Sequence, residues 1–125
     1  MEGPDSFAAA QSAAFAAGCY LATGQLNEAE TYLNDANRVV TAFYDEDNAT
    51  LSLIINSYGV LYWKQGRLEK AKDCFERALE IRERLFGKNH PNTCGTSQLL
   101  SELKLEMNLP ENAHESSDES EEKVN

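Results

Sequence analysis

Apolar residues recur at intervals of three and four along most of the chain, which is the spacing of one helix face. The clearest stretch carries its apolar face on Leu51, Ile54, Ile55, Tyr58, Leu61 and Tyr62. A second helix is predicted from about 68 to 85, with inward positions at Ala71, Phe75, Ala78, Leu79 and Leu85. Its charged residues are expected to lie mostly outward, and they are Glu69, Lys70, Lys72, Asp73, Glu76, Arg77, Glu80, Arg82, Glu83 and Arg84. Gly66 separates the two, because glycine accepts the left-handed backbone that ends a helix.

The same pattern occurs twice at a fixed offset of 42 residues. The matching pairs are Tyr20 with Tyr62, Gly24 with Gly66, Leu26 with Leu68, Ala29 with Ala71, Leu33 with Phe75, and Ala36 with Ala78. An earlier helical pair is therefore predicted at about 6–23 and 26–44. After the turn that ends in Pro91, a fifth helix is predicted at about 92–107, since proline suits the first helical turn.

These elements predict an all-α fold. We expect an α-solenoid of about two helical hairpins with a C-terminal capping helix, in which each hairpin packs on its neighbour. The expected boundaries are a repeat domain over 1–109, with repeats at about 8–47 and 50–91, and a separate segment over 110–125.

Charge is distributed unevenly along the chain. The formal net charge is −10, from 21 acidic and 11 basic residues, and residues 111–125 hold six of the acids. Such a chain repels phosphate backbones and anionic lipids, so nucleic acid and membrane are not expected partners. Residues 110–125 are too charged to build a core and are expected to form a disordered acidic tail.

The acidic segment contains three serines, Ser116, Ser117 and Ser120, that lie among aspartates and glutamates. They resemble substrates of acidophilic kinases, so a phosphoprotein is one interpretation. The other is a tail that only keeps the chain in solution.

Candidate catalytic chemistry is sparse. Cys19, Cys74 and Cys94 have no metal-ligand spacing and are expected to be reduced, buried, small apolar side chains. His90 precedes a proline and His114 lies in the tail, so no nucleophile and histidine are paired by local spacing. We expect no enzyme activity, no cofactor and no metal. A chain without a basic leader or a long apolar run is expected in the cytoplasm, with the nucleus as the alternative.

The motifs of the second repeat resemble the tetratricopeptide repeat. That family places a glycine three residues before a tyrosine and an alanine four residues before a phenylalanine. The matching residues here are Gly59 and Tyr62, then Ala71 and Phe75, with Ala78 following. The long period and the turn from Gly87 to His90-Pro91 are similar to the kinesin-light-chain variety. The first repeat departs from this pattern, with Ala17 in place of Gly59 and Asn48-Ala49 in place of His90-Pro91.

The resemblance implies a protein-binding adaptor or scaffold. Its partner, a peptide or an amphipathic helix, would lie on the concave wall that the first helix of each pair forms. The candidate groove residues are Leu53, Asn56, Val60, Trp63, Lys64 and Gln98. Asn56 matches an asparagine that holds the peptide backbone in light-chain-type repeats, or else it bonds a neighbouring helix. Trp63 is expected either to be an exposed binding anchor or to pack as core.

The first predicted helix favours another kind of function. It is rich in alanine and carries Phe7 and Phe15, which is typical of a surface for close packing against another helix. Two repeats and a cap make a thin stack, so a homodimer through this helix would supply the missing core. The alternative function is an accessory end-piece of a larger enzyme or repeat assembly. Similar helix pairs form the C-terminal lobes of MYND-type proteins, although this chain has neither their zinc cysteines nor their catalytic domain.

Overall fold

The computed structural model describes residues 6–44 and 47–108, and within them the chain forms helices and no strand. The elements are α1 (Phe7–Ala22), α2 (Leu26–Phe43), α3 (Ala49–Lys64), α4 (Leu68–Phe86) and α5 (Pro91–Asn108). The all-α prediction is confirmed, and the four helices with expected bounds, α1, α2, α4 and α5, each begin and end within one residue of them. The predicted tail and its three serines lie outside the described residues.

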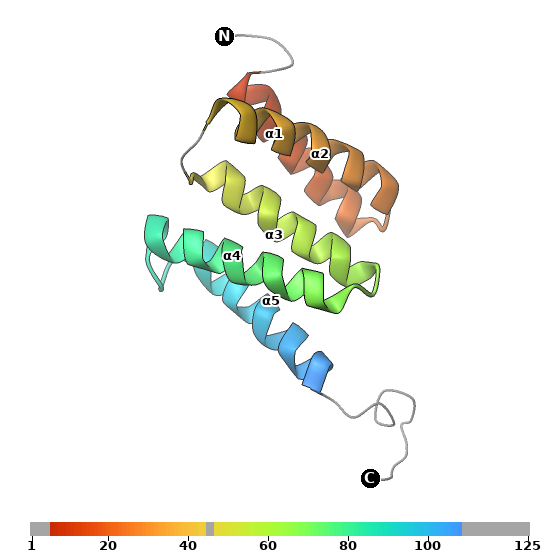
Figure 1. Cartoon of the computed structure of the whole chain (residues 1–125), viewed down its shortest axis with the longest axis vertical. Helices are drawn as coiled ribbons and strands as arrows, with labels where there is room; N and C mark the ends of the chain where they lie inside the picture. The colour runs from red at the N-terminus through yellow and green to blue at the C-terminus, as the bar shows by residue number, and fades with distance from the viewer. Residues whose placement is uncertain (1–5, 45–46, 109–125) are drawn as a thin grey trace.

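The helices are arranged as two antiparallel hairpins followed by a single helix (Figure 1). α1 packs on α2, α3 packs on α4, and α3 also contacts both helices of the first hairpin. α5 packs mainly against α4. α3 is therefore the central helix of the stack.

The two hairpins begin and turn in the same way. Ser6 caps α1 by accepting a hydrogen bond from the Ala9 amide at 3.1 Å, and Asn48, 42 residues later, caps α3 by accepting one from Leu51 at 2.8 Å. The turns use Gly24 and Gly66, whose φ angles are 81° and 80°. Only glycine adopts that backbone region at little cost, which is why both repeats have it there.

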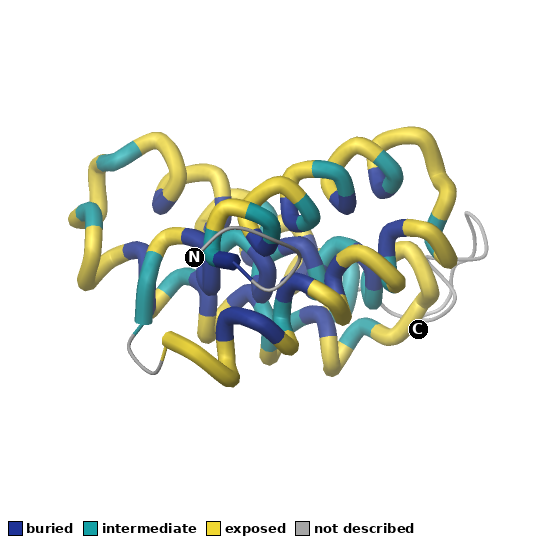
Figure 2. The backbone as a smooth tube through the Cα atoms, turned by 90° about the horizontal axis from the view of Figure 1, so that it is seen from above, coloured by how far each residue is buried: buried dark blue, intermediate teal, exposed yellow. Residues whose placement is uncertain are grey.

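The core consists of two clusters of buried residues along the stack. Figure 2 shows buried positions on the sides of the helices that face one another and exposed positions on the outer sides. One cluster joins α1, α2 and α3 with Ala78 and Ile81 of α4, and a smaller one joins Ala71 and Phe75 to Leu100 and Leu103 of α5. The second cluster gives α5 its apolar contact with the rest of the molecule.

The two helices of the second hairpin approach each other closely at Gly59. A Cβ atom placed on Gly59 would lie 2.6 Å from Cε1 of Phe75. Phe75 is fully buried, so its ring occupies the space that a side chain at position 59 would need. The tetratricopeptide-like glycine and phenylalanine are therefore matched in size.

Three expectations about burial are wrong. Leu85 is 41% exposed, because it lies in the last turn of α4 as the chain leaves the core. Arg82 is buried, because it follows Ala71, Phe75 and Ala78 on the same helix face at spacings of four, three and four. Cys19 and Cys94 are exposed, and only Cys74 is partly buried.

Candidate functional site

Two opposite faces of α3 each border a cavity. Leu53, Val60 and Lys64 share one face, because they are separated by seven and four residues. Tyr58 and Tyr62 lie half a helical turn away from them. We call the face that carries Leu53, Asn56 and Val60 the inner face.

The inner face borders a cavity of about 190 Å³, which we call the Arg82 cavity. Its walls come from α1, α3, α4 and the start of α5, and its lining residues are Gln11, Phe15, Ala49, Thr50, Leu53, Arg82 and Asn92. Leu53 was predicted at the site. Phe15 is 61% exposed, so it forms an apolar rim beside a polar interior.

Arg82 connects three helices at the floor of this cavity. Its Nε donates to Ser52 Oγ of α3 at 3.1 Å. Its Nη1 donates to the Asn92 carbonyl at 3.2 Å and to Thr96 Oγ1 at 2.7 Å, both in α5. Thr93 Oγ1 in turn donates to the Arg82 carbonyl at 3.2 Å. The arginine therefore fixes the first turns of α5 against α3 and α4.

The guanidinium of Arg82 is a buried charge with neutral partners. Only 8% of the residue is exposed, and no carboxylate within the described part of the chain forms an ion pair with it. Burial lowers the pKa of Arg82 from its usual value. An arginine nevertheless keeps its proton at physiological pH, so the positive charge persists in the cavity.

Two helix N-termini add to this positive potential. α3 begins at Ala49 and α5 begins at Pro91, and residues of both first turns line the cavity. The N-terminal end of a helix carries a partial positive charge and amide groups that lack helical acceptors. The partial positive charges of these two N-termini have the same sign as the charge of Arg82.

Asn56 lies next to this network. Its Oδ1 accepts a hydrogen bond from Thr96 Oγ1 at 2.9 Å, so the expected bond to a neighbouring helix exists. The Asn56 side-chain NH₂ makes no hydrogen bond to the described residues. Gln98 of α5 is exposed, and its Nε2 donates to Glu102 Oε2 at 3.2 Å.

Trp63 is half-buried rather than exposed. Its indole Nε1 donates to Glu106 Oε1 at 2.9 Å, and its ring meets Phe75 edge-on with 6.0 Å between ring centroids. Val60 is also half-buried and packs against both core clusters. Lys64, at the end of α3, is exposed. Trp63 thus contributes to the contact between α3 and α5, as the core interpretation expects.

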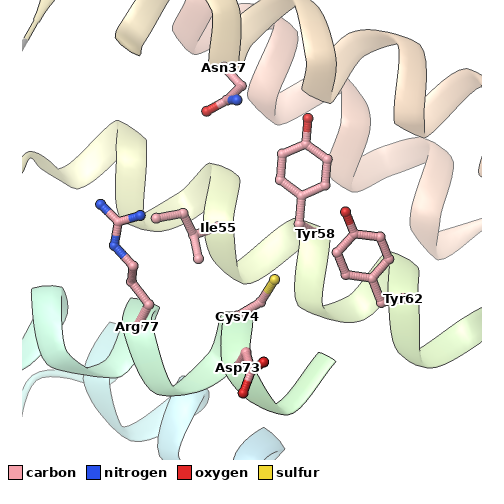
Figure 3. A pocket seen from close by; sticks show the side chains of 7 residues that line it. All are labelled: Asn37, Ile55, Tyr58, Tyr62, Asp73, Cys74 and Arg77. Atoms are coloured by element: carbon pink, nitrogen blue, oxygen red, sulfur yellow. The ribbon is translucent and has the colours of Figure 1, made fainter. Parts of the chain in front are cut away.

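A second cavity, of about 280 Å³, lies on the opposite face of α3 (Figure 3). It is lined by Asn37, Ile55, Tyr58, Tyr62, Asp73, Cys74 and Arg77. Figure 3 shows the two tyrosines of α3 between Asn37 of α2 and the α4 side chains. Their rings are stacked with centroids 5.9 Å apart, and the Tyr58 hydroxyl donates to Asn34 Oδ1.

Burial raises the pKa values of two side chains of the second cavity, Tyr58 and Cys74. It is the main cause that raises the pKa of Tyr58 to about 12, with smaller contributions from Tyr62, Glu30 and Cys74. Burial also raises the pKa of the Cys74 thiol, followed by the charge of Asp73. A thiol that keeps its proton is a weak nucleophile, so this cavity has no activated cysteine.

The sequence analysis missed Arg82, Phe15 and Thr50 as site residues. Arg82 was assigned to the charged outer face, although its spacing from Ala78 and Phe75 places it on the apolar stripe. That spacing was the signal that could have revealed it. Within residues 6–44 and 47–108, no three side chains of the metal-ligating types are grouped, and none of the helices has the length and apolarity needed to cross a bilayer.

Comparison with known proteins agrees with this architecture. A family model described as tetratricopeptide repeat matches residues 47–122, which is more than half of the chain. A nucleotide-binding leucine-rich repeat (NLR)-like protein from Hyaloscypha variabilis is 30% identical over 67 residues. That match covers 52% of this chain but only 7% of the relative, so the chain corresponds to a small part of a much longer protein.

Proposed function

The chain belongs to the tetratricopeptide repeat family, and on that premise we propose that it is a kinesin-light-chain-like adaptor that binds a peptide or amphipathic helix on its inner face. Tetratricopeptide repeats generally mediate protein–protein interaction. The proposed contact residues are Leu53, Asn56, Val60, Trp63, Lys64 and Gln98, with Phe15 added at the rim.

The arrangement of Asn56 is the observation that carries this proposal. The hydrogen bond from Thr96 fixes its oxygen, while its NH₂ group has no partner among the described residues. The NH₂ group can donate a hydrogen bond to a carbonyl of an extended peptide. Because the side chain is already fixed, less rotamer entropy is lost on binding. Leu53 and Val60, on the same face, supply the apolar contact.

Selection of a random peptide library on the full-length chain tests the proposal. Binding peptides are expected to lose affinity by at least about tenfold on Leu53→Asp, because a charge would replace an apolar contact. Leu105→Asp is the matched control, since Leu105 is exposed on α5 and lines neither cavity. Equal binding to both variants would contradict the proposed face.

The second candidate function is that of a repeat module within a larger assembly or a self-associating unit. The short match to a far longer NLR-like protein supports the first form. The exposed Phe15 on the alanine-rich α1 supports the second. Light scattering on the full chain, compared with a Phe15→Ser variant, tests self-association. A dimer that becomes a monomer in the variant would support it, and a monomer in both would exclude α1 as the dimer contact.

A further inference from the structure

We propose that the Arg82 cavity binds the carboxylate of one aspartate or glutamate side chain in the partner peptide. This inference rests on the proposed function and deepens it, because it assigns a chemical class to one position of the ligand. The structure supports it through the bonding of Arg82, the polar lining of the cavity and the position of the cavity on the inner face.

The first step concerns the donors that Arg82 has left. Nε and Nη1 are used by Ser52, Asn92 and Thr96, whereas Nη2 makes no hydrogen bond or ion pair to the described residues. A guanidinium has five N–H donors, so two remain on Nη2. Arg82 is more than nine-tenths buried and lines the cavity, so the cavity is the route by which a ligand would reach these donors.

The second step concerns the charge. A buried cation among neutral acceptors is costly unless an anion approaches it. Among the groups of a peptide, a carboxylate best matches the planar guanidinium of arginine, because its two oxygens can accept from two N–H groups at once. The first turns of α3 and α5 act in the same direction through their partial positive charge.

The third step concerns the other lining groups. Thr50 is 3% exposed, and its hydroxyl has no hydrogen-bond partner within the described part of the chain. It can donate to a second carboxylate oxygen. Gln11 is exposed on α1 at the same cavity and can contact the ligand from the opposite wall.

The fourth step concerns the source of the carboxylate. A cavity of about 190 Å³ has room for a single side chain, and Leu53 continues the inner face beyond it. A side chain of a peptide that passes along the face therefore fits the site. The acidic segment of this chain follows Asn108, about 24 Å along α5 from Asn92, and the test below treats it as the competing occupant.

The test is an NMR titration of the full-length chain with capped alanine–leucine peptides. One peptide carries a single glutamate, the second carries glutamine there, and the third has neither but ends in a free carboxylate. The glutamate peptide is expected to shift the Arg82 Nε–H and the amides of Thr50 and Asn92, with about tenfold higher affinity than the glutamine peptide. Equal affinity of the first two peptides would overturn the carboxylate assignment, and selective binding of the third would overturn the side-chain source.

A charge placed at the cavity mouth gives a second test without disturbing the Arg82 bonds. Gln11→Glu is expected to weaken binding of the glutamate peptide by at least about fivefold, because its own carboxylate competes for the guanidinium. Ser12→Glu adds the same charge to the exposed neighbouring position, which does not line the cavity, and should change affinity by less than about twofold. Equal losses in both variants would show a general charge effect and overturn the inference.

The remaining outcomes separate this inference from the proposed function. If both capped peptides shift Leu53 and Val60 but not Arg82, the inner face binds peptide and the carboxylate site is wrong. If no described amide shifts at millimolar peptide, the carboxylate inference fails, and the library selection still decides the proposed function. If the Arg82 signal moves only when Glu115, Asp118 and Glu119 are changed to their amides, the occupant is the chain's own acidic segment.

Discussion

The two hairpins differ in the chemistry of the buried residue at the junction with the next helix. Val40 and Arg82 are equivalent at the 42-residue offset, and both are buried near the helix that follows their hairpin. Around Arg82 the acceptors are Ser52, Thr96 and the Asn92 carbonyl. The positions equivalent to Ser52 and Thr96 are occupied by the buried, apolar Ala10 and Ile54.

One backbone position therefore carries an apolar side chain in the first repeat and a charged one in the second, where we propose that it also recognises a ligand. At the first junction the side chain joins the main apolar cluster and offers nothing to a ligand. At the second junction, the hydrogen bonds of Arg82 hold α5, and Arg82 lines a cavity.

The largest effect is expected when the first junction receives the residue of the second. Val40→Arg should lower the free energy of unfolding by about 3–5 kcal/mol, because the cation would be buried without acceptors. Urea unfolding followed by circular dichroism measures the change. Thr41→Arg, at the exposed next position, is the control and should change stability by less than about 0.5 kcal/mol. Equal stability of the two variants would show that the first junction also accommodates a guanidinium.

The next effect concerns the size match inside each hairpin. Gly59→Ala should destabilise the chain by about 1–3 kcal/mol, because the new Cβ would overlap the Phe75 ring. The equivalent residues in the first hairpin are Ala17 and Leu33, both fully buried. The double variant Gly59→Ala, Phe75→Leu places the same alanine–leucine pair in the second hairpin. It should recover most of the stability that Gly59→Ala alone removes.

A double-mutant cycle in urea measures the coupling of the two positions. The expected coupling is favourable and at least about 0.5 kcal/mol. If the two single effects simply add, the glycine is not required by the phenylalanine.

The third effect compares the two helix caps. Ser6→Ala and Asn48→Ala should each cost about 1 kcal/mol, because each removes the acceptor of a first-turn amide. Amide hydrogen exchange should show faster opening at Ala9 in the first variant and at Leu51 in the second. Ser12→Ala, inside α1, is the control for Ser6. Unchanged exchange at Ala9 would contradict the assignment of Ser6 as a stabilising cap.

The smallest effect tests whether a helical glycine without a close neighbour behaves differently from Gly59. Gly95→Ala in α5 should raise stability by about 0.5–1 kcal/mol, since no atom lies within 4 Å of the added Cβ and alanine favours the helix. Thermal unfolding monitored by circular dichroism measures the gain. A loss of stability would show that the exposed side of α5 has packing partners that glycine permits.

The sequence predicted the helices well because two local signals repeat. Gly24 and Gly66 mark the turns, and the apolar stripe of α3 has its expected spacing. The site was harder to predict, because it depends on which charged residue is buried. The spacing from Phe75 and Ala78 places Arg82 on the buried face of α4, whereas the acceptors on α3 and α5 that let a charge stay there lie on other helices. Such contacts are not visible in a single helix.

The position of Trp63 has an optical consequence. It is the single tryptophan of the chain, and its indole touches Phe75 of α4 and Glu106 of α5. Because α5 packs mainly on one helix, it is the element expected to detach first when the stack opens locally. Tryptophan fluorescence therefore reports on the detachment of α5 without any added label. During unfolding, the red shift of its emission is expected before the helical circular dichroism signal is lost.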